Sequence, residues 1–167
     1  MTGKILAAVI VVSAILSGFL MYYLQVYGFY QEVSPRGVED VQLTSVATGQ
    51  PEPILFENFK AIDSDSSPLR YRACFETPMS EAMLTETYVV YDDPIPNVAP
   101  GWFDCFDADA IGAALEAGTA LAFLGTENIV YGVDRVVAIT DTGRGYVWHQ
   151  INACGEEVFD GRPAPEG

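Results

Sequence analysis

The strongest structural signal in this chain is an uninterrupted apolar stretch near the amino terminus. Residues 5–24 contain no charged side chain and read ILAAVIVVSAILSGFLMYYL. Twenty helical residues rise about 30 Å, which matches the hydrocarbon thickness of a bilayer. The alternative is a cleaved secretory signal, which needs small residues just beyond the apolar core, where this chain has Met21, Tyr22, Tyr23 and Leu24. We therefore expect residues 1–30 to form an uncleaved transmembrane anchor.

The charges that flank this stretch predict its orientation. Lys4 and the terminal amine precede it, whereas Arg36 follows it among Glu32, Glu39 and Asp40. Positive charge favours the cytoplasmic side of a membrane. The amino terminus is therefore expected in the cytoplasm, and the rest of the chain in the periplasm or outside the cell.

Two sets of side chains on the predicted helix suggest contacts within the membrane. Small residues at helical spacing, which let a second helix approach closely, are Ser13, Ala14, Ser17 and Gly18. Aromatic residues on one face are Phe19, Tyr23, Tyr27 and Tyr30. An interfacial aromatic belt explains the second set without a partner, and we favour it over a contact with another membrane protein.

The charge of the chain restricts its partners. The sequence holds 23 acidic residues against eight basic ones, for a net charge of −15. A domain of this sign repels nucleic acid, and we expect it to stand off from anionic lipid as well. Solubility is the simpler explanation of the charge, and attraction of a basic partner is the alternative.

Beyond the anchor, the pattern predicts a linker at residues 31–40, a domain at 41–160 and a loose tail at 161–167. Strand patterns occupy residues 41–47, 69–77, 120–124, 129–133, 135–140 and 144–151, the last two joined as a hairpin across residues 141–143. Residues 80–86 suggest a helical turn. The principal helix begins after Asp107, a good N-cap, and ends before Gly118. This order predicts an α+β domain with a largely antiparallel sheet and one principal helix.

The three cysteines are the first candidates for chemistry. Cys74 lies on a predicted strand and Cys105 just before the principal helix, so we favour a structural disulfide between them over three buried thiols including Cys154. No CxxC motif occurs, which argues against a thioredoxin-type redox pair and against a zinc knuckle.

The single histidine and the methionines offer weak signals for catalysis or metal binding. His149 shares a strand face with Val147 and Ile151, which is typical of a core side chain. A Cys/His hydrolase would require His149 beside one of the cysteines. Copper held by Met79, Met83 and His149 is the corresponding metal hypothesis, but methionines at helical spacing usually belong to a core.

The acidic clusters give no strong cation site. Residues 63–67 begin like a calcium loop, yet Pro68 occupies the glycine position and Cys74 the position of the bidentate glutamate. Capping and the helix dipole account for the acids near the principal helix, Asp104, Asp107 and Asp109. We therefore predict no metal and no cofactor.

The whole chain resembles a small family of uncharacterised single-span membrane proteins of alphaproteobacteria. The segments that carry the resemblance are MYYLQVYGFYQEV, GWFDCFDADAIGAALEAG, YGVDRVVAI and WHQINACGEEVFDG. The resemblance implies a Gram-negative inner-membrane setting and no assigned activity. Members are sometimes labelled histidine kinases, but this sequence has no glycine-rich ATP-binding segment and its histidine lies in a predicted strand.

Two functional hypotheses follow. The leading one is a non-enzymatic, membrane-anchored accessory or interaction protein of the cell envelope, with its domain in the periplasm and the lipid bilayer as its first partner. The alternative is an envelope enzyme or metal-dependent module that uses Cys105, Cys154, His149 and nearby aspartates. Convergence of these side chains in one cleft would favour the enzyme.

Overall fold

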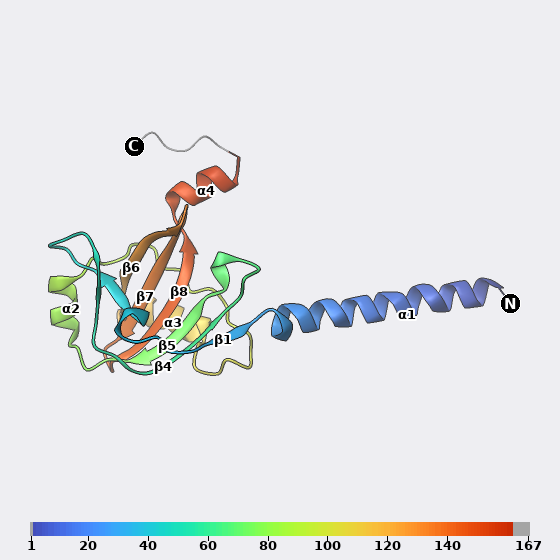
Figure 1. Cartoon of the computed structure of the whole chain (residues 1–167), viewed down its shortest axis with the longest axis horizontal. Coiled ribbons are helices and arrows are strands. Elements are labelled where there is room, and N and C mark those ends of the chain that lie inside the picture. Colours follow the sequence, from blue (N-terminus) through green and yellow to red (C-terminus); the bar gives the residue numbers. More distant parts are fainter. Residues whose placement is uncertain (1, 162–167) are drawn as a thin grey trace.

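A computed structural model describes residues 2–161, so the predicted tail lies outside the described residues except for Gly161. The chain begins with a long helix, α1 (Thr2–Tyr23), which continues as a π-helical turn, η1 (Leu24–Gly28). This helix projects away from a domain that lies wholly at its carboxyl end (Figure 1). Within the described residues, one helix (Gly3–Gly28) is long and apolar enough to cross a membrane, and none of it is buried against the domain.

The centre of the domain is a six-stranded antiparallel sheet, which confirms the α+β prediction. Its strand order is β1-β4-β5-β8-β7-β6. The strands are β1 (Gln31–Val33), β4 (Glu57–Asp63), β5 (Arg72–Glu76), β6 (Ala120–Val130), β7 (Val133–Thr140) and β8 (Arg144–Ile151). The β7–β8 hairpin turns at residues 141–143, as predicted.

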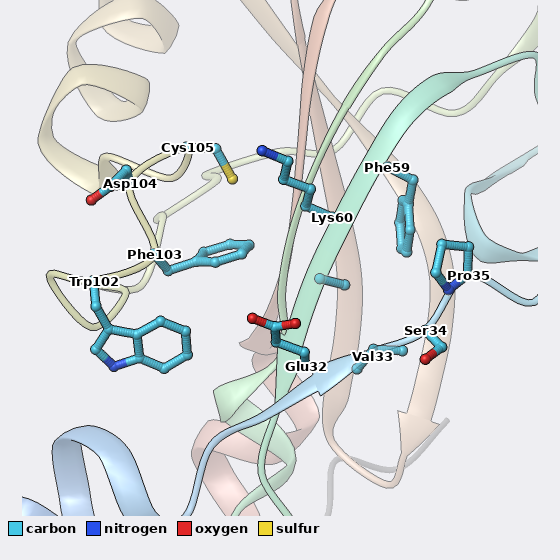
Figure 2. Close-up of a pocket in the computed structure, with 11 residues that line it drawn as sticks. Glu32, Val33, Ser34, Pro35, Phe59, Lys60, Trp102, Phe103, Asp104 and Cys105 are labelled. Carbon is cyan, nitrogen blue, oxygen red and sulfur yellow. The ribbon is translucent and has the colours of Figure 1, made fainter.

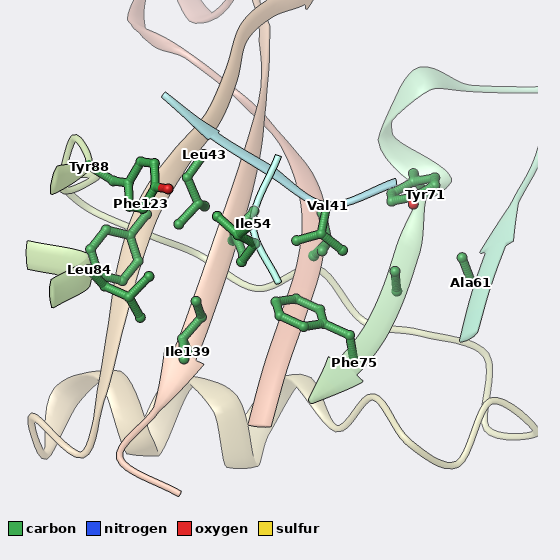
Figure 3. Packing of buried hydrophobic residues seen from close by; sticks show 13 residues of the cluster. Val41, Leu43, Ile54, Ala61, Tyr71, Phe75, Leu84, Tyr88, Phe123 and Ile139 are labelled. Carbon is green, nitrogen blue, oxygen red and sulfur yellow. The ribbon is translucent and has the colours of Figure 1, made fainter. Parts of the chain in front are cut away.

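One face of the sheet is covered by a second, two-stranded sheet and a short helix. The small sheet pairs β2 (Gln42–Thr44) with β3 (Pro51–Pro53), and the helix is α2 (Glu81–Thr87). Figure 3 shows their side chains packing on the strands. Alternation along β5 directs Ala73 and Phe75 to this face. The buried cluster here includes Val41, Leu43, Leu84, Phe123, Val137 and Val147.

The other face packs against α3 (Ala108–Glu116) and the loop before it. Asp107 caps this helix, since its Oδ1 accepts from the Ala110 N–H at 3.1 Å. Gly118 follows the helix at φ 71°, a left-handed conformation that favours glycine. The buried cluster on this face includes Cys74, Phe106, Ile111, Val136, Ala138 and Trp148. The predicted helix is confirmed at both ends.

Three local predictions differ from the structure. Residues 129–133 do not form a strand of their own, because Gly132 at φ 78° turns the chain between β6 and β7. Residues 31–40 are not a free linker, since they contribute β1 and the 3₁₀ turn η2 (Val38–Asp40). The strand predicted at 69–77 begins only at Arg72, after the 3₁₀ turn η3 (Pro68–Arg70). The helix α4 (Ala153–Phe159), capped by Asn152, was not predicted.

Candidate functional site at the junction of helix and domain

The end of the apolar helix presents backbone carbonyl groups that have no partner inside the helix. The last four carbonyls of any helix need donors from elsewhere. Two side chains of the domain supply them here. The indole Nε1–H of Trp102 donates to the Val26 carbonyl at 2.7 Å, and Nη1 of Arg70 donates to the Gln25 carbonyl at 3.4 Å. Residues distant in sequence therefore cap the helix.

Aromatic contacts reinforce this junction. The rings of Tyr30 and Trp102 meet edge to face with centroids 6.1 Å apart. The guanidinium of Arg70 lies over the Tyr30 ring at 5.5 Å. Such cation–π and edge-to-face contacts each stabilise an arrangement by about 0.5–1.5 kcal/mol. The helix is therefore fixed to the domain by contacts from three chain segments.

A buried arginine holds the loop that leads to Trp102. Arg72 on β5 is 3% exposed. Its Nε donates to the Asn97 carbonyl and its Nη2 to the Val98 carbonyl, at 2.7 and 3.1 Å. Its Nη1 donates to the carbonyls of Leu69 and Tyr71, both at 2.7 Å. Burial lowers the pKa of Arg72 to about 10, so the guanidinium keeps its charge at neutral pH.

A disulfide pins the same loop three residues beyond Trp102. Cys74 on β5 is bonded to Cys105, with their Cα atoms 6.2 Å apart. This is the pair that the sequence favoured. Cys154 lies on α4 as a half-buried free thiol. The loop from residue 97 to 105 is thus attached to the sheet by Arg72 at one end and by the disulfide at the other.

A groove runs between this loop and the edge of the sheet. Its first part, a hollow of ≈ 470 Å³, separates the rings of Trp102 and Phe103 from Glu32 on β1 and Lys60 on β4 (Figure 2). A second hollow of ≈ 580 Å³ shares Lys60 and Cys105 with the first and extends toward Arg144. Within residues 2–161 the Lys60 and Arg144 side chains make no hydrogen bond or ion pair, so both remain available to a ligand.

His149 lies on the other face of the sheet, away from the groove. Its ring stacks on Tyr71 with centroids 4.8 Å apart. Nδ1 lies 2.6 Å from the Pro68 carbonyl, which can only accept, so Nδ1 carries the proton and Nε2 accepts from Arg135 Nε at 3.1 Å. Burial, followed by the charge of Arg135, lowers the His149 pKa to about 3. The imidazole is a neutral core group with both nitrogens bonded.

The residues of the enzyme alternative do not meet in one place. Cys105 is bonded to Cys74, and His149 is 5% exposed on the opposite face of the sheet. Cys154 follows β8 on α4. In the part of the chain that the structure describes, no three histidine, cysteine, aspartate or glutamate side chains are grouped to hold a metal ion.

The other candidate ligands also lie apart. Met79 packs against the core, whereas Met83 is exposed on α2. Asp63 Oδ1 accepts from the Ser64 N–H at 2.8 Å, and Asp107 caps α3. These contacts account for the side chains without an ion.

The candidate residues of the apolar helix are exposed, except for Tyr30 beyond its end. The small set is Ser13, Ala14, Ser17 and Gly18, with Ser13 Oγ donating to the Ile10 carbonyl at 2.9 Å. In the aromatic set, Phe19, Tyr23 and Tyr27 are exposed, whereas Tyr30 is half-buried against Trp102. Tyr30 therefore belongs to the junction. No domain residue that the structure describes covers the small set.

Sequence reasoning did not identify Arg70, Trp102 or Lys60. Trp102 did carry a signal, because a tryptophan between Gly101 and Phe103 in a proline-rich loop is a large apolar side chain where small polar residues are usual. Its partner, however, is a backbone carbonyl 76 residues away. No local pattern specifies such a contact.

Comparison with known proteins identifies a family but no characterised relative. A family model described as a family of unknown function (DUF6446) matches residues 41–167, which begin after the apolar helix, β1 and η2. No curated protein and no solved structure matches the chain.

Proposed function

We propose that this chain, which belongs to the family of unknown function DUF6446, is a single-pass membrane-anchored accessory protein whose domain serves as an interaction module of the cell envelope. The observation that carries the proposal is α1. Together with η1 it forms an apolar helix, Gly3–Gly28, in which no described residue is buried and whose last carbonyls the domain caps. Apolar surface of this extent needs a cover of lipid or of another protein.

The disulfide supports an extracytoplasmic position for the domain. Disulfides persist in oxidising compartments and are rare in the cytoplasm. The link between Cys74 and Cys105 therefore agrees with the charge bias that predicts Lys4 on the cytoplasmic side. Together with the resemblance to alphaproteobacterial proteins, these features favour the bacterial inner membrane with the domain in the periplasm.

The groove supports an interaction role. It places the rings of Trp102 and Phe103 opposite the charged side chains of Glu32 and Lys60, a mixture that suits recognition of a polar partner. Cys105 and His149, two of the residues of the enzyme alternative, are engaged in structural contacts instead. A partner helix packed on the small residues around Gly18 would bring its own extracytoplasmic part close to this groove.

A topology experiment tests the anchor. A reporter that fluoresces only in the cytoplasm, fused after Gly167, should stay dark, while an amino-terminal tag should remain on the protein and resist alkaline extraction from membranes. Loss of the tag would indicate a cleaved signal. A fluorescent fusion would place the domain in the cytoplasm and contradict the proposal.

A second experiment tests the interaction. Gly18→Leu adds bulk at the small-residue face and should weaken detergent co-purification of a membrane partner without preventing insertion. Leu16→Phe, on the opposite face of the helix, is the matched control. Equal recovery of every partner with both variants would argue for the aromatic-belt interpretation, in which α1 contacts lipid alone.

A further inference from the structure

We infer that the junction end of the domain, defined by Tyr30, Arg70 and Trp102, is embedded in the lipid headgroup layer and binds phospholipid headgroups. This inference rests on the proposed function, because it requires α1 to cross the membrane. It differs from the expectation, based on net charge, that the domain stands off from the lipid surface.

The position of the two capping contacts carries the argument. The apolar stretch ends at Leu24, and the capped carbonyls belong to the next two residues, Gln25 and Val26. At about 1.5 Å per residue these carbonyls lie within about 3 Å of the hydrocarbon boundary. The headgroup layer is about 5–8 Å thick on each side. A side chain that bonds to these carbonyls must therefore lie inside that layer.

The chemistry of the junction suits this position. A tryptophan with an apolar ring and one bonded N–H is typical of a membrane interface, as are tyrosines. Three further aromatic residues at the carboxyl end of the helix, Tyr23, Tyr27 and Phe29, are 51%, 47% and 43% exposed. No water-soluble surface needs such a cluster, whereas the boundary between lipid and water favours it.

Arg70 supplies the group that recognises the headgroup. A guanidinium has five N–H donors, and the structure gives Arg70 one hydrogen bond, of 3.4 Å, to the Gln25 carbonyl. The remaining donors can bind the phosphodiester group that all phospholipids share. Because this recognition needs a phosphate rather than a net negative lipid, the negative charge of the domain does not oppose it.

The two tryptophans of the chain make a direct test available. Trp148 is 0% exposed in the core, whereas Trp102 lies at the junction. The full chain is reconstituted in phosphatidylcholine vesicles whose lipids carry bromine either near the glycerol or near the chain end. Bromine quenches indole fluorescence only at close approach. Shallow bromine should quench the emission more than deep bromine, and Trp102→Phe, which leaves Trp148 as reporter of folding, should abolish the quenching.

Other outcomes separate the inference from the proposed function. If shallow bromine leaves the emission unchanged while the chain resists alkaline extraction, the anchor holds and the inference is wrong. If quenching survives in Trp102→Phe, the signal comes from Trp148 and the inference is also wrong. A chain that alkaline washing removes contradicts the proposed function itself.

A pair of arginine variants tests the phosphate contact. Arg70→Gln should reduce the quenching by shallow bromine, because the junction loses its attraction to the phosphate layer. Arg144→Gln changes an exposed base that makes no junction contact. Shallow bromine should quench the emission of this variant as much as that of the natural protein. Identical quenching in both variants would overturn the role of Arg70.

Discussion

Phe75 and Gly145 face each other across β5 and β8, and the phenylalanine ring occupies the space that a side chain at residue 145 would need. They are direct partners in the antiparallel register. A Cβ atom placed on Gly145 would lie 2.0–2.4 Å from three atoms of the ring. The ring in turn packs against Phe56 with centroids 6.2 Å apart. Glycine at this position is therefore required by packing.

Gly145→Ala is expected to destabilise the domain by about 1–3 kcal/mol, because the ring of Phe75 must leave its place in the core. Chemical denaturation followed by circular dichroism measures the effect. Gly112→Ala, in α3, is the matched control, because a Cβ atom on Gly112 would meet no atom within 4 Å. Alanine should stabilise that helix by about 0.5–1 kcal/mol. Equal effects at the two sites would contradict the packing argument.

Reduction of the disulfide should lower the melting temperature. The bond between Cys74 and Cys105 closes a loop with a sequence separation of 31. On the loop-entropy model, this closure stabilises the folded chain by about 3–4 kcal/mol, because it restricts the unfolded chain. Mass spectrometry of unreduced, alkylated protein should show modification of Cys154 alone. Alkylation of all three thiols without reductant would disprove the bond, and Cys154→Ser should leave the melting temperature sensitive to reduction.

Arg72→Met should destabilise the domain by about 2–4 kcal/mol, since the methionine retains most of the apolar stem but leaves four carbonyls without their donor. The loop that carries Trp102 should also become mobile, which acrylamide quenching of its fluorescence can detect. Arg144→Met removes an exposed base and should change stability by less than about 0.5 kcal/mol. Similar losses in both variants would show that the buried guanidinium does not hold the loop.

Acid should weaken the domain through His149. The pKa of this group is about 3 in the folded chain and about 6.5 in the unfolded chain, so between these values the unfolded chain binds more protons. Neutral His149 therefore contributes its full share to the unfolding free energy above pH about 6.5. This contribution decreases as the pH falls toward about 3, by at most about 1.4 kcal/mol per pH unit. His149→Gln should flatten the dependence of unfolding free energy on pH in this window. A wild-type slope in the variant would assign the effect to other groups.

Several elements of the fold could be predicted because their signals are local. Asp107 and Gly118 mark the ends of α3 through capping and a left-handed residue, both of which act within one turn. The β7–β8 hairpin follows from its turn residues. The three residues of β1 are too few to show an alternating pattern, so the sequence predicts a linker for a segment that pairs with β4.

The candidate site was predictable only in part. The cysteines are few, and a strand followed by a helix limits how they can pair. The junction contacts of Trp102 and Arg70 had no such constraint. Each joins a side chain to a backbone carbonyl, and every residue except its own neighbours offers an equivalent acceptor.

Two elements could be predicted because their free energy depends on near neighbours: the apolar helix, through its length and lack of charge, and the capped helix α3. The role of the loop before α3 became visible only in the folded chain. Folding of the sheet places Arg72 and Cys74 beneath this loop, and the loop then presents Trp102 to the end of α1. The physical reason is that hydrogen bonds and packing act over a few ångströms, and the residues that meet at the junction are separated by 45 and 76 positions along the chain.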